Sequence, residues 1–537
     1  MDIFDCEKTP LKIDKPIRLI ELFAGVGSQA KALERLGADF EHYKISEWEV
    51  NATASYKAIH KGGDNTDYSA RFTSDELTDV LFNIGISTDG KKPLLVKEIA
   101  RKGEQWKRTV YNNFKATNNI GSILNVKGAD LGIVDTDRYT YILTYSFPCQ
   151  DLSLAGKGKG MAKDSGTRSG LLWEVERLLN ECTELPQLLL MENVTQVHGS
   201  KNKEHFDEWI RFLESKGYSN YWKDLNAKNF GIPQNRNRTF MVSVLGEYIY
   251  RFPKEFPLEL RLKDMLEDSV DEKFYLSGSM INYFRENTEK QRAKGNGFKF
   301  APTDGSGCGR AVTTRAGGRM DDNFIEEQPV LIGGMQKNQA IKKDDISTTL
   351  TSAMGCGGGY VPMVTEPLAY DEQNQYLRTD GTVGTLTTDG SSPKHNNRVI
   401  ENCYVSEKGV KFICSPKRGM TTDVNADVCQ PLTAKGQANW TGSFVSPDIE
   451  GLEKSSTIGS TEPTKINLKN GGTVTSNDNL SGLRIRKLTP KECWRLMGFD
   501  DADFEKAAEV NSNSQLYKQA GNSIVVDVLY YIFRGML

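Results

Sequence analysis

The chain has 537 residues, of which 38% are hydrophobic and 26% charged, and its formal net charge at pH 7 is −3. This length exceeds one ordinary hydrophobic core, so we expect two domains with insertions. No run of 18 or more apolar residues occurs, which excludes a membrane-spanning chain and predicts a soluble, globular protein. A weakly acidic chain binds nucleic acid only through a local basic face.

The cysteines and the first residues indicate a compartment. Nine cysteines are scattered singly and none forms a CxxC pair, which argues against a zinc site and against a disulfide framework. The opening MDIFDCEKTPLKIDKP holds no apolar signal core. We therefore expect a cytoplasmic protein that carries no metal ion.

The first 245 residues alternate strand-like apolar runs with helical segments. Strands are expected at 17–23, 42–45, 141–146, 188–191 and 239–244, and helices at 28–36, 50–59, 171–179 and 204–215. This alternation predicts an α/β fold with a doubly wound, largely parallel, Rossmann-like sheet. Between Lys61 and Gly128 the pattern fades into polar sequence, which we interpret as an insertion.

The sequence changes character after about Gly246. Residues 290–480 are rich in Gly, Thr, Ser and Asn with short β-runs, which predicts a second, β- and loop-rich domain. Helical character returns at 489–496 and 523–533. The expected division is a first domain at 14–248 with an insertion at about 61–128, a second domain at 249–482, and a segment at 483–537 that returns to complete the first domain.

The second domain carries a weak internal repeat. An apolar residue followed by Thr, with Gly four or five positions after the apolar residue, begins at Val312, Leu350, Leu386 and Leu432. The spacings of 38, 36 and 46 residues are too irregular for a solenoid. We favour four strand-and-turn units of one domain over independent modules in tandem.

A strand that runs into a glycine turn marks a candidate cofactor end. Residues 17–27 read IRLIELFAGVG, so Gly25 and Gly27 let the backbone turn sharply and approach a ligand at a helix N-terminus, although a plain packing turn is common. Glu47 ends the next strand, where nucleotide-binding α/β folds place the carboxylate that holds ribose hydroxyls. Trp48 beside it is placed to stack on an adenine. GxGxxG is absent, which favours a mononucleoside-like cofactor over NAD.

Three polar motifs adjoin the later strands. Phe147-Pro148-Cys149-Gln150 follows the third strand, and Glu192 ends the fourth, so both should face the crevice at the carboxyl edge of the sheet. Taken alone, Cys149 is more often a buried structural cysteine. Gln234-Asn235-Arg236-Asn237-Arg238 supplies two cations before the fifth strand, and alone it would be a solvated turn.

Together these motifs are specific. FAGVG, EW, PCQ, ENV, QNRNR and the late Gln519-Ala-Gly-Asn-Ser523 occur in this order, and the sequence resembles the DNA cytosine-5 methyltransferases. Two further runs support the match, DLNAKNFGIP at 224–233 and RKLTPKECWRLMGF at 486–499. The resemblance covers about the first 245 and the last 55 residues. The middle then corresponds to that family's target-recognition domain, and the first domain to its catalytic domain.

The resemblance implies a covalent mechanism. Cytosine C5 becomes nucleophilic only when a group adds at C6, and a thiolate both adds and leaves readily. Cys149 takes that role, on a cytosine flipped out of double-stranded DNA. Glu192 would protonate N3 of the base, braced by Asn193. Arg238 would contact the base, and Arg236 would support the site or the backbone.

The resemblance also implies S-adenosylmethionine as the cofactor. It leads us to expect a monomeric, nucleoid-associated enzyme of either of two kinds: one of a restriction-modification system, with a cognate endonuclease that acts separately, or one that protects phage DNA by methylation. Asp130 is the candidate acidic partner of the adenine, although the insertion disturbs the family's spacing there. Asn522 would close the pocket from the far end of the chain. The expected cofactor residues are Phe23, Ala24, Gly25, Gly27, Glu47, Trp48, Asp130, Pro148, Leu171 and Asn522.

Three other functions compete with this interpretation. An RNA (tRNA) cytosine-5 methyltransferase shares the motifs, but the large middle domain favours DNA. A catalytically silent DNA-binding regulator is disfavoured because Cys149, Glu192 and Arg238 are all present. A thiol hydrolase would need a histidine paired with its cysteine, and none of the five histidines lies in a motif that would supply one.

Overall fold

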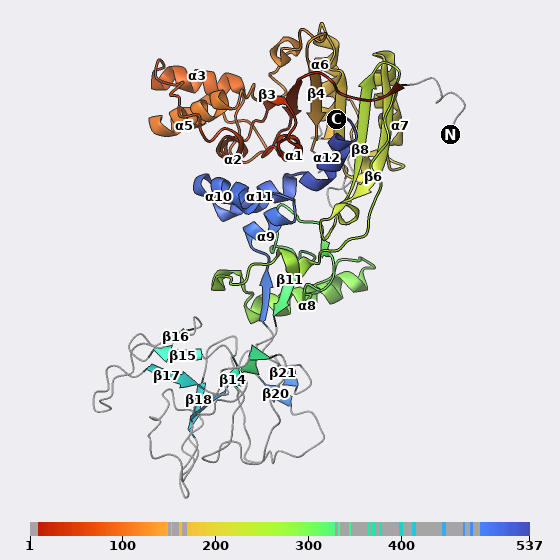
Figure 1. Ribbon diagram of the computed structural model, residues 1–537. Coiled ribbons are helices and arrows are strands. Elements are labelled where there is room, and N and C mark those ends of the chain that lie inside the picture. Colours follow the sequence, from red (N-terminus) through yellow and green to blue (C-terminus); the bar gives the residue numbers. More distant parts are fainter. Residues whose placement is uncertain are drawn as a thin grey trace, which may run out of the picture. The chain divides into compact units, whose positions relative to one another are not determined.

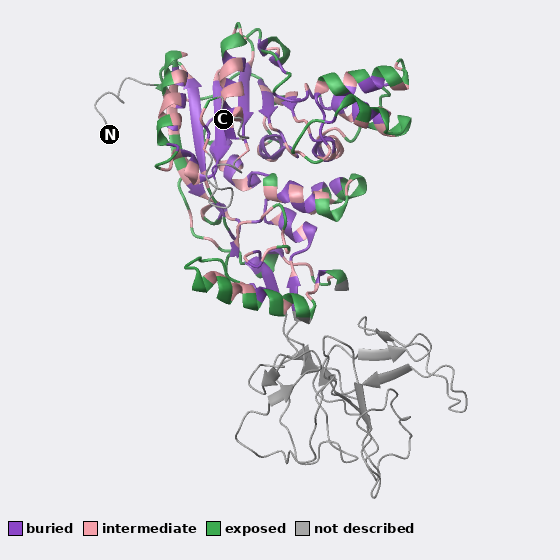
Figure 2. Ribbon diagram, turned by 180° about the vertical axis from the view of Figure 1, so that it is seen from behind, coloured by how far each residue is buried: buried purple, intermediate pink, exposed green. Residues whose placement is uncertain are grey.

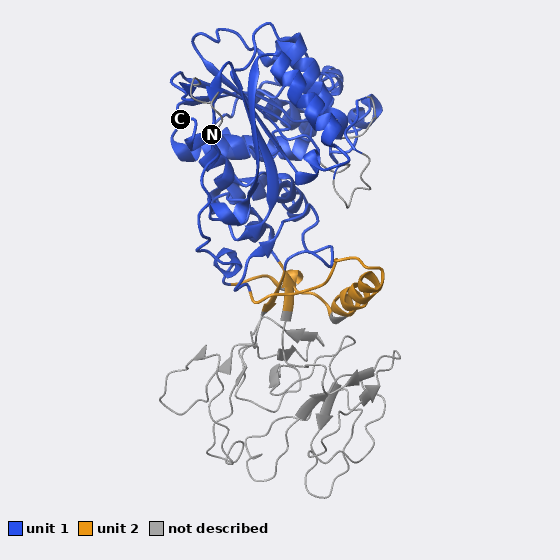
Figure 3. Ribbon diagram, turned by 90° about the vertical axis from the view of Figure 1, so that its right-hand side faces the viewer, with its two compact units in different colours: residues 1–268, 305–323, 488–537 blue, residues 269–304, 324–487 orange. Residues whose placement is uncertain are grey.

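The computed structural model describes residues 9–148, 152, 160–163, 169–327 and 484–537, and between 328 and 483 only short strands (Figure 1). The chain forms two compact units, shown in Figure 3. Unit 1 holds residues 1–268, 305–323 and 488–537, and unit 2 holds 269–304 and 324–487. Unit 1 runs to residue 268 rather than 248, takes in residues 305–323, and resumes at 488 rather than 483. No helix in the described part is long and apolar enough to span a membrane.

A six-stranded sheet with the order β3-β2-β4-β5-β8-β6 forms the framework of unit 1. Strands β2 to β5 run parallel, and β8 is antiparallel to both of its neighbours. The predicted α/β fold with a largely parallel sheet is confirmed. The strands are β2 Ile17–Leu22, β3 Phe40–Ser46, β4 Thr140–Tyr145, β5 Leu188–Asn193, β6 Tyr218–Asn226 and β8 Asn237–Leu245.

The sheet lies between helices, and most of its strand residues are coloured as buried in Figure 2. Ile20 and Leu22 join the core that α6 and α7 complete, because alternate side chains of a strand share one face. Glu21, between them, turns to the opposite face and accepts a hydrogen bond from the Ala30 amide of α1, which packs against α12. The helices outside the insertion are α1 Ser28–Leu36, α2 Val50–His60, α6 Leu172–Glu181, α7 Lys203–Ser215, α9 Pro490–Arg495, α10 Asp501–Val510, α11 Asn513–Asn522 and α12 Val526–Arg534.

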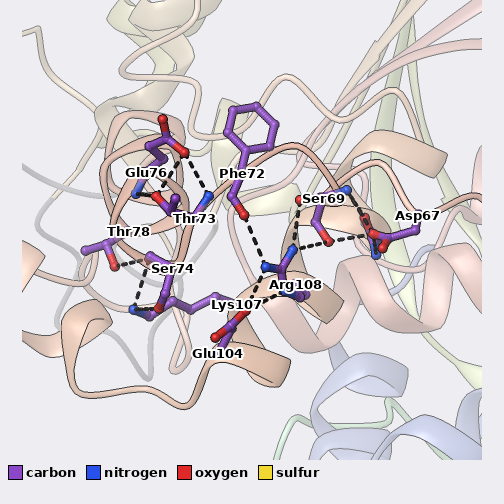
Figure 4. Close-up of polar contacts among 11 residues, drawn as sticks. Asp67, Ser69, Phe72, Thr73, Ser74, Glu76, Thr78, Glu104, Lys107 and Arg108 are labelled. Carbon is purple, nitrogen blue, oxygen red and sulfur yellow. Dashed lines mark hydrogen bonds and ion pairs between the residues drawn. The ribbon is translucent and has the colours of Figure 1, made fainter.

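The insertion between α2 and β4 is helical, which its polar sequence did not predict. It holds α3 Ser74–Ile84, α4 Val96–Ala100 and α5 Glu104–Ala116, packed around a small apolar core of their own. A reciprocal capping box of Thr73 and Glu76 starts α3. Arg108 of α5 donates to the carbonyls of Ser69 and Phe72, so it ties the loop before α3 to α5 (Figure 4).

The segment 305–323 joins unit 1 through polar contacts. Its short strand β10 Gly309–Arg310 pairs in parallel with β7 Gln234–Asn235. Val312, where the first repeat begins, is buried, and its amide donates to the Gln234 side chain at 2.9 Å. The first repeat is thus part of unit 1, whereas Leu350, Leu386 and Leu432 lie outside the described residues. A further short pair joins β1 Thr9–Pro10 to β9 Tyr248–Ile249.

Unit 2 is described mainly around one antiparallel pair, β11 Phe324–Glu327 with β22 Arg484–Lys487. Helix α8 Gly278–Ala293 contributes the buried Phe284, whose ring packs against Phe300 and Phe324. The short strands between residues 331 and 475 form separate antiparallel groups. They are β12 Leu331–Ile332, β13 Lys343–Asp344, β14 Met363–Val364, β15 Leu368–Asp371, β16 Tyr376–Arg378, β17 Asn397–Ile400, β18 Lys411–Cys414, β19 Ser443–Ser446, β20 Lys465–Asn467 and β21 Thr473–Thr475.

Candidate active site

The strand register lines up the expected site residues along the carboxyl edge of the sheet. Across neighbouring strands, the aligned positions are Ser46, Leu22, Tyr145 and Met191. The residue after each one therefore occupies the same step at this edge, where open α/β sheets bind their ligands. These residues are Glu47, Phe23, Ser146 and Glu192.

The glycine turn after β2 has a constrained backbone. Phe23 has φ of 60°, which is unusual for a bulky residue, and its amide donates to the Ser46 carbonyl at 2.8 Å. Gly27, at φ 84°, caps α1, and a Cβ there would lie 2.3 Å from Nε2 of His60. Gly25, at φ 58°, has nothing within 4 Å of a Cβ. With the buried Ala24, this turn is a closely packed bend that leaves room for a ligand at Gly25.

The Glu47 carboxylate lies against that turn. Its Oε2 accepts a hydrogen bond from the Gly25 amide at 2.9 Å, and its Oε1 accepts one from the Glu49 amide at 2.8 Å. Burial raises the pKa of Glu47 to about 7, although both amide hydrogen bonds favour the charged form. Glu47 is thus a half-buried acid fixed by backbone donors beside the glycine turn.

Asn119 is a site residue that the sequence reasoning missed. Its Oδ1 accepts from the Glu47 amide at 3.2 Å, and its Nδ2 donates to the Glu47 carbonyl at 2.8 Å. It follows α5 and bridges to Ile45 in parallel, which brings the end of the insertion back to the carboxyl edge. The signal in the sequence was the polar pair Asn118-Asn119 before the apolar Ile120, hidden because the whole region was interpreted as an insertion.

Asp130 does not lie at this edge, which corrects the expectation that it contacts the cofactor. It is exposed in the 3-10 turn η2 Gly128–Leu131, and its carboxylate accepts from the Lys127 amide at 2.8 Å. This turn packs against the end of α6 and precedes the start of β4. It therefore adjoins the opposite edge of the sheet, and the residue caps a turn.

The other expected cofactor residues differ in burial and in their contacts. Trp48 is half-buried beside Glu47, and Pro148 accepts a hydrogen bond from the Ser169 hydroxyl at 2.8 Å. Leu171 precedes α6 and packs against the core, as an ordinary helix residue does. Asn522 ends α11 and is exposed.

Glu192 is a buried acid with two side-chain partners. The Ser146 hydroxyl donates to its Oε2 at 2.6 Å, and Nε of Arg238 lies 3.3 Å from its Oε1. The side chain of Glu192 is 7% exposed and that of Arg238 is 20% exposed. The carboxylate is therefore held between a neutral donor and a cation that still reaches the surface.

The reversed direction of β8 brings Arg238 to this acid. A residue that begins a parallel strand would lie at the amino edge of the sheet, away from Glu192. Because β8 runs antiparallel to β5, with Thr239 opposite Asn193, its first residues lie at the carboxyl edge. The same reversal places the whole QNRNR run there.

Asn193 holds the backbone rather than Glu192, which corrects the expected bracing. It is buried, and its Nδ2 donates to the Phe147 carbonyl at 2.9 Å. Its Oδ1 accepts from the Val194 amide at 2.9 Å. It thereby fixes the chain two residues before Cys149, which itself lies outside the described residues.

Arg236 has a role in joining distant segments. It is buried and donates to the carbonyls of Val312 at 3.1 Å, Gly521 at 3.1 Å and Ser523 at 2.9 Å. Gln234 adds a bond from its Nε2 to the Leu496 carbonyl. Gln234 and Arg236 thus bind the segments around residue 312 and at 521–523. Within the QNRNR run, Arg238 is the residue that contacts Glu192.

Comparisons with known proteins agree on one family. A sequence model described as C-5 cytosine-specific DNA methylase matches residues 81–537. The type II methyltransferase M2.ScrFI of Lactococcus lactis subsp. cremoris is 39% identical over 522 residues, covering 97% of this chain and 99% of that protein. The orphan methyltransferase M.SssI of Spiroplasma monobiae is 40% identical over 285 residues, covering 52% and 72%. The orphan methyltransferase M.Rho11sI of Bacillus phage rho11s is 26% identical over 574 residues, covering 97% and 98%.

Proposed function

This chain belongs to the C-5 cytosine-specific DNA methylase family, and from that premise we propose that it methylates C5 of a flipped-out cytosine in double-stranded DNA, through a covalent adduct on Cys149. The observation that carries the proposal is the pairing of the buried Glu192 with Arg238 at the edge where β4 leads into Cys149. S-adenosylmethionine, when bound, supplies the methyl group.

The residues at the glycine turn fit such a cofactor. Gly25 leaves open space for a ligand, and Glu47 presents a carboxylate, whose lone pairs suit ribose hydroxyls, beside it. Trp48 adjoins this carboxylate with a half-buried indole. We call Phe23–Gly27, Glu47–Glu49 and Asn119 the cofactor half of the sheet edge.

Glu192 and Arg238 fit the base. A carboxyl that gives a proton to N3 of cytosine makes C6 more electrophilic, and a cation beside it stabilises charge that develops on the ring. The Ser146 hydroxyl holds Oε2 of Glu192, which leaves Oε1 for Arg238 and the base. We call Ser146, Glu192, Asn193, Arg236 and Arg238 the base half of the edge.

Cys149 is the nucleophile in this proposal. A thiolate adds to C6, and C5 then accepts the methyl group. A base or a water molecule takes the C5 proton, its electron pair restores the double bond of the ring, and the C–S bond breaks to release the thiolate. The bonds of Asn193 to Phe147 and of Ser169 to Pro148 fix the backbone on the approach to Cys149. Precise placement of a nucleophile contributes to rate by aligning it with the reacting atom.

The names of the relatives support a proposal for the biological setting. M2.ScrFI is named a type II methyltransferase, and M.SssI and M.Rho11sI are named orphan methyltransferases. We propose protective methylation of a specific DNA site, with any cognate endonuclease acting as a separate protein. The second unit would read the sequence through groove contacts.

Bisulfite sequencing tests this function. DNA from cells that express the chain should contain protected cytosines in one or a few fixed sequence contexts, and cells that express Cys149→Ala should contain none. Total RNA from the same cells, treated in the same way, provides the matched comparison. Protection found only in tRNA, or no protection in DNA, would contradict the proposal.

A further inference from the structure

Two histidines and a glutamate meet behind the glycine turn, apart from the residues assigned above. They come from three elements: Glu34 from α1, His42 from β3 and His60 from the end of α2. Their ligand atoms all lie within 4.8 Å of one another. The side chain of His60 is fully buried, that of His42 is 13% exposed and that of Glu34 is 33% exposed, so the cluster opens to solvent on one side.

The outer nitrogen of each histidine already has a partner. Nε2 of His60 lies 3.0 Å from the Val26 carbonyl, which can only accept, so that nitrogen carries a hydrogen. The Tyr56 hydroxyl donates to Glu21 at 2.6 Å, so its oxygen accepts from Nδ1 of His42 at 3.2 Å. Metal-bound histidines show this arrangement, in which the second nitrogen donates to a carbonyl or another acceptor.

The inner nitrogens then face the carboxylate. Nδ1 of His60 lies 2.7 Å from Oε1 of Glu34, and Nε2 of His42 lies 3.4 Å from the same oxygen. With their hydrogens on the outer nitrogens, both rings present a lone pair on the side of the carboxylate, so two nitrogens and one oxygen can bind the same cation.

The two contacts with Glu34 are close to the ligand spacings of a small transition-metal ion. Zn²⁺ binds His nitrogen and carboxylate oxygen at about 2.0–2.2 Å, so tetrahedral ligand atoms lie about 3.3 Å apart. The contact between His42 and Glu34 already has this length, and that between His60 and Glu34 would open by about 0.6 Å. Two imidazoles and one carboxylate with an open fourth position form a ligand set that Zn²⁺ prefers.

We propose that Glu34, His42 and His60 form a Zn²⁺ site that fastens α1, β3 and α2 together beneath the glycine turn. The sequence predicted no metal because its cysteines are unpaired, and these three ligands are adjacent only in the fold. His60 also contacts the turn directly, since a Cβ on Gly27 would overlap its ring. Zn²⁺ would therefore stiffen the turn independently of the methyl-transfer chemistry.

Metal titration of the full chain tests this site. Protein freed of metal by a chelator should bind one Zn²⁺ in competition with a chromogenic chelator, and one Co²⁺ with the visible absorption of a tetrahedral site. Glu34→Gln and His42→Gln should each weaken binding by about 100-fold or more. Tyr56→Phe, which removes the outer partner of His42, should weaken it by about 10–100-fold.

The matched control is His205→Gln, which alters a histidine 3.8 Å from Glu208 on α7, outside the cluster. It should bind Zn²⁺ as the wild type does, and Zn²⁺ should raise Tm in both but not in His42→Gln. Wild-type protein that takes up no more metal than His42→Gln would overturn the proposal and leave an ion-pair cluster. A Co²⁺ complex with thiolate charge-transfer bands, retained in both ligand variants, would overturn it in favour of cysteine binding.

Discussion

In the cofactor half of the sheet edge, Glu47 is held by the backbone amides of Gly25 and Glu49, whereas in the base half Glu192 is held by the side chains of Ser146 and Arg238. The first arrangement draws on neighbouring segments of the chain. The second depends on the antiparallel strand β8, and its Arg236 binds the carbonyls of Val312 and Gly521, which are distant in the sequence.

This difference predicts how each half responds to single substitutions. A backbone donor is removed only by proline, so other substitutions in the cofactor half should reduce affinity and leave the shape of the site unchanged. Side-chain networks lose their geometry when one member is truncated, because buried partners are left unpaired. We therefore expect larger single-residue effects in the base half.

Among the described residues, Glu192→Gln should give the largest effect on rate. Glutamine keeps the shape and can still accept from Ser146, but it cannot give a proton to the base. Methyl transfer to DNA should fall by about 100- to 10,000-fold, while cofactor affinity stays within twofold of the wild type. Single-turnover transfer of labelled methyl measures the first, and calorimetry the second. Loss of cofactor binding in this variant would show that the two halves do not act independently, which would contradict the comparison.

Arg236→Met should give the largest effect on stability. The substitution leaves three backbone carbonyls without their donor, and we expect unit 1 to lose about 3 kcal/mol or more of unfolding free energy. Arg238→Met is the comparison variant and should cost less, because the Arg238 side chain is 20% exposed and its substitution leaves one carboxylate oxygen rather than three carbonyls without a partner. Urea unfolding measures both. Equal losses would mean that the two arginines share one role.

Glu47→Ala should weaken S-adenosylmethionine binding by about 10–150-fold, or about 1.5–3 kcal/mol. Burial raises the pKa of Glu47 to about 7, and ribose hydroxyls donate to the ionised form. Wild-type affinity should then be full above pH 7 and fall about tenfold per unit below it. Calorimetry from about pH 5.5 to about pH 8.5 checks this dependence. If the affinity of Glu47→Gln depended on pH in the same way, Glu47 would not be the group that binds the cofactor.

Asp130→Ala should give the smallest effect. The residue caps an exposed turn, so the free energy of unfolding should fall by about 0.5–1 kcal/mol with no change in cofactor affinity. Asn119→Ala, next to Glu47, should weaken cofactor binding. If Asp130→Ala proved the weaker binder of the two, the sequence expectation would be right and the position given to Asn119 wrong.

The sequence was sufficient where local signals decide the structure. The helix expected at 28–36 occupies those residues, and Gly37 at φ 65° ends it. The positions of Glu47 and Glu192 followed because each directly ends a strand of a parallel sheet. The Thr73–Glu76 capping box was also readable, but the polar exposed faces of α3 and α5 hid the insertion's helices.

The rest depended on contacts that no local pattern carries. Hydrophobic alternation does not give a strand's direction, so the reversal of β8 that delivers Arg238 was not predictable. The role of Arg236 rests on carbonyls 76 to 287 residues away. Residues 305–323 were assigned to the second domain because their composition is loop-like. Their strand pairing with Gln234 and Asn235 and the bonds of Val312 to Gln234 and Arg236 place them in unit 1.

Covalent trapping tests the central claim most directly. DNA that carries 5-fluorocytosine at the methylated position should form a stable adduct with the wild-type chain in the presence of S-adenosylmethionine, because fluorine cannot leave as a proton does. Mass spectrometry should locate the adduct on Cys149, and Cys149→Ala should form none while it still binds cofactor. An adduct on another cysteine, or turnover by Cys149→Ala, would contradict the account.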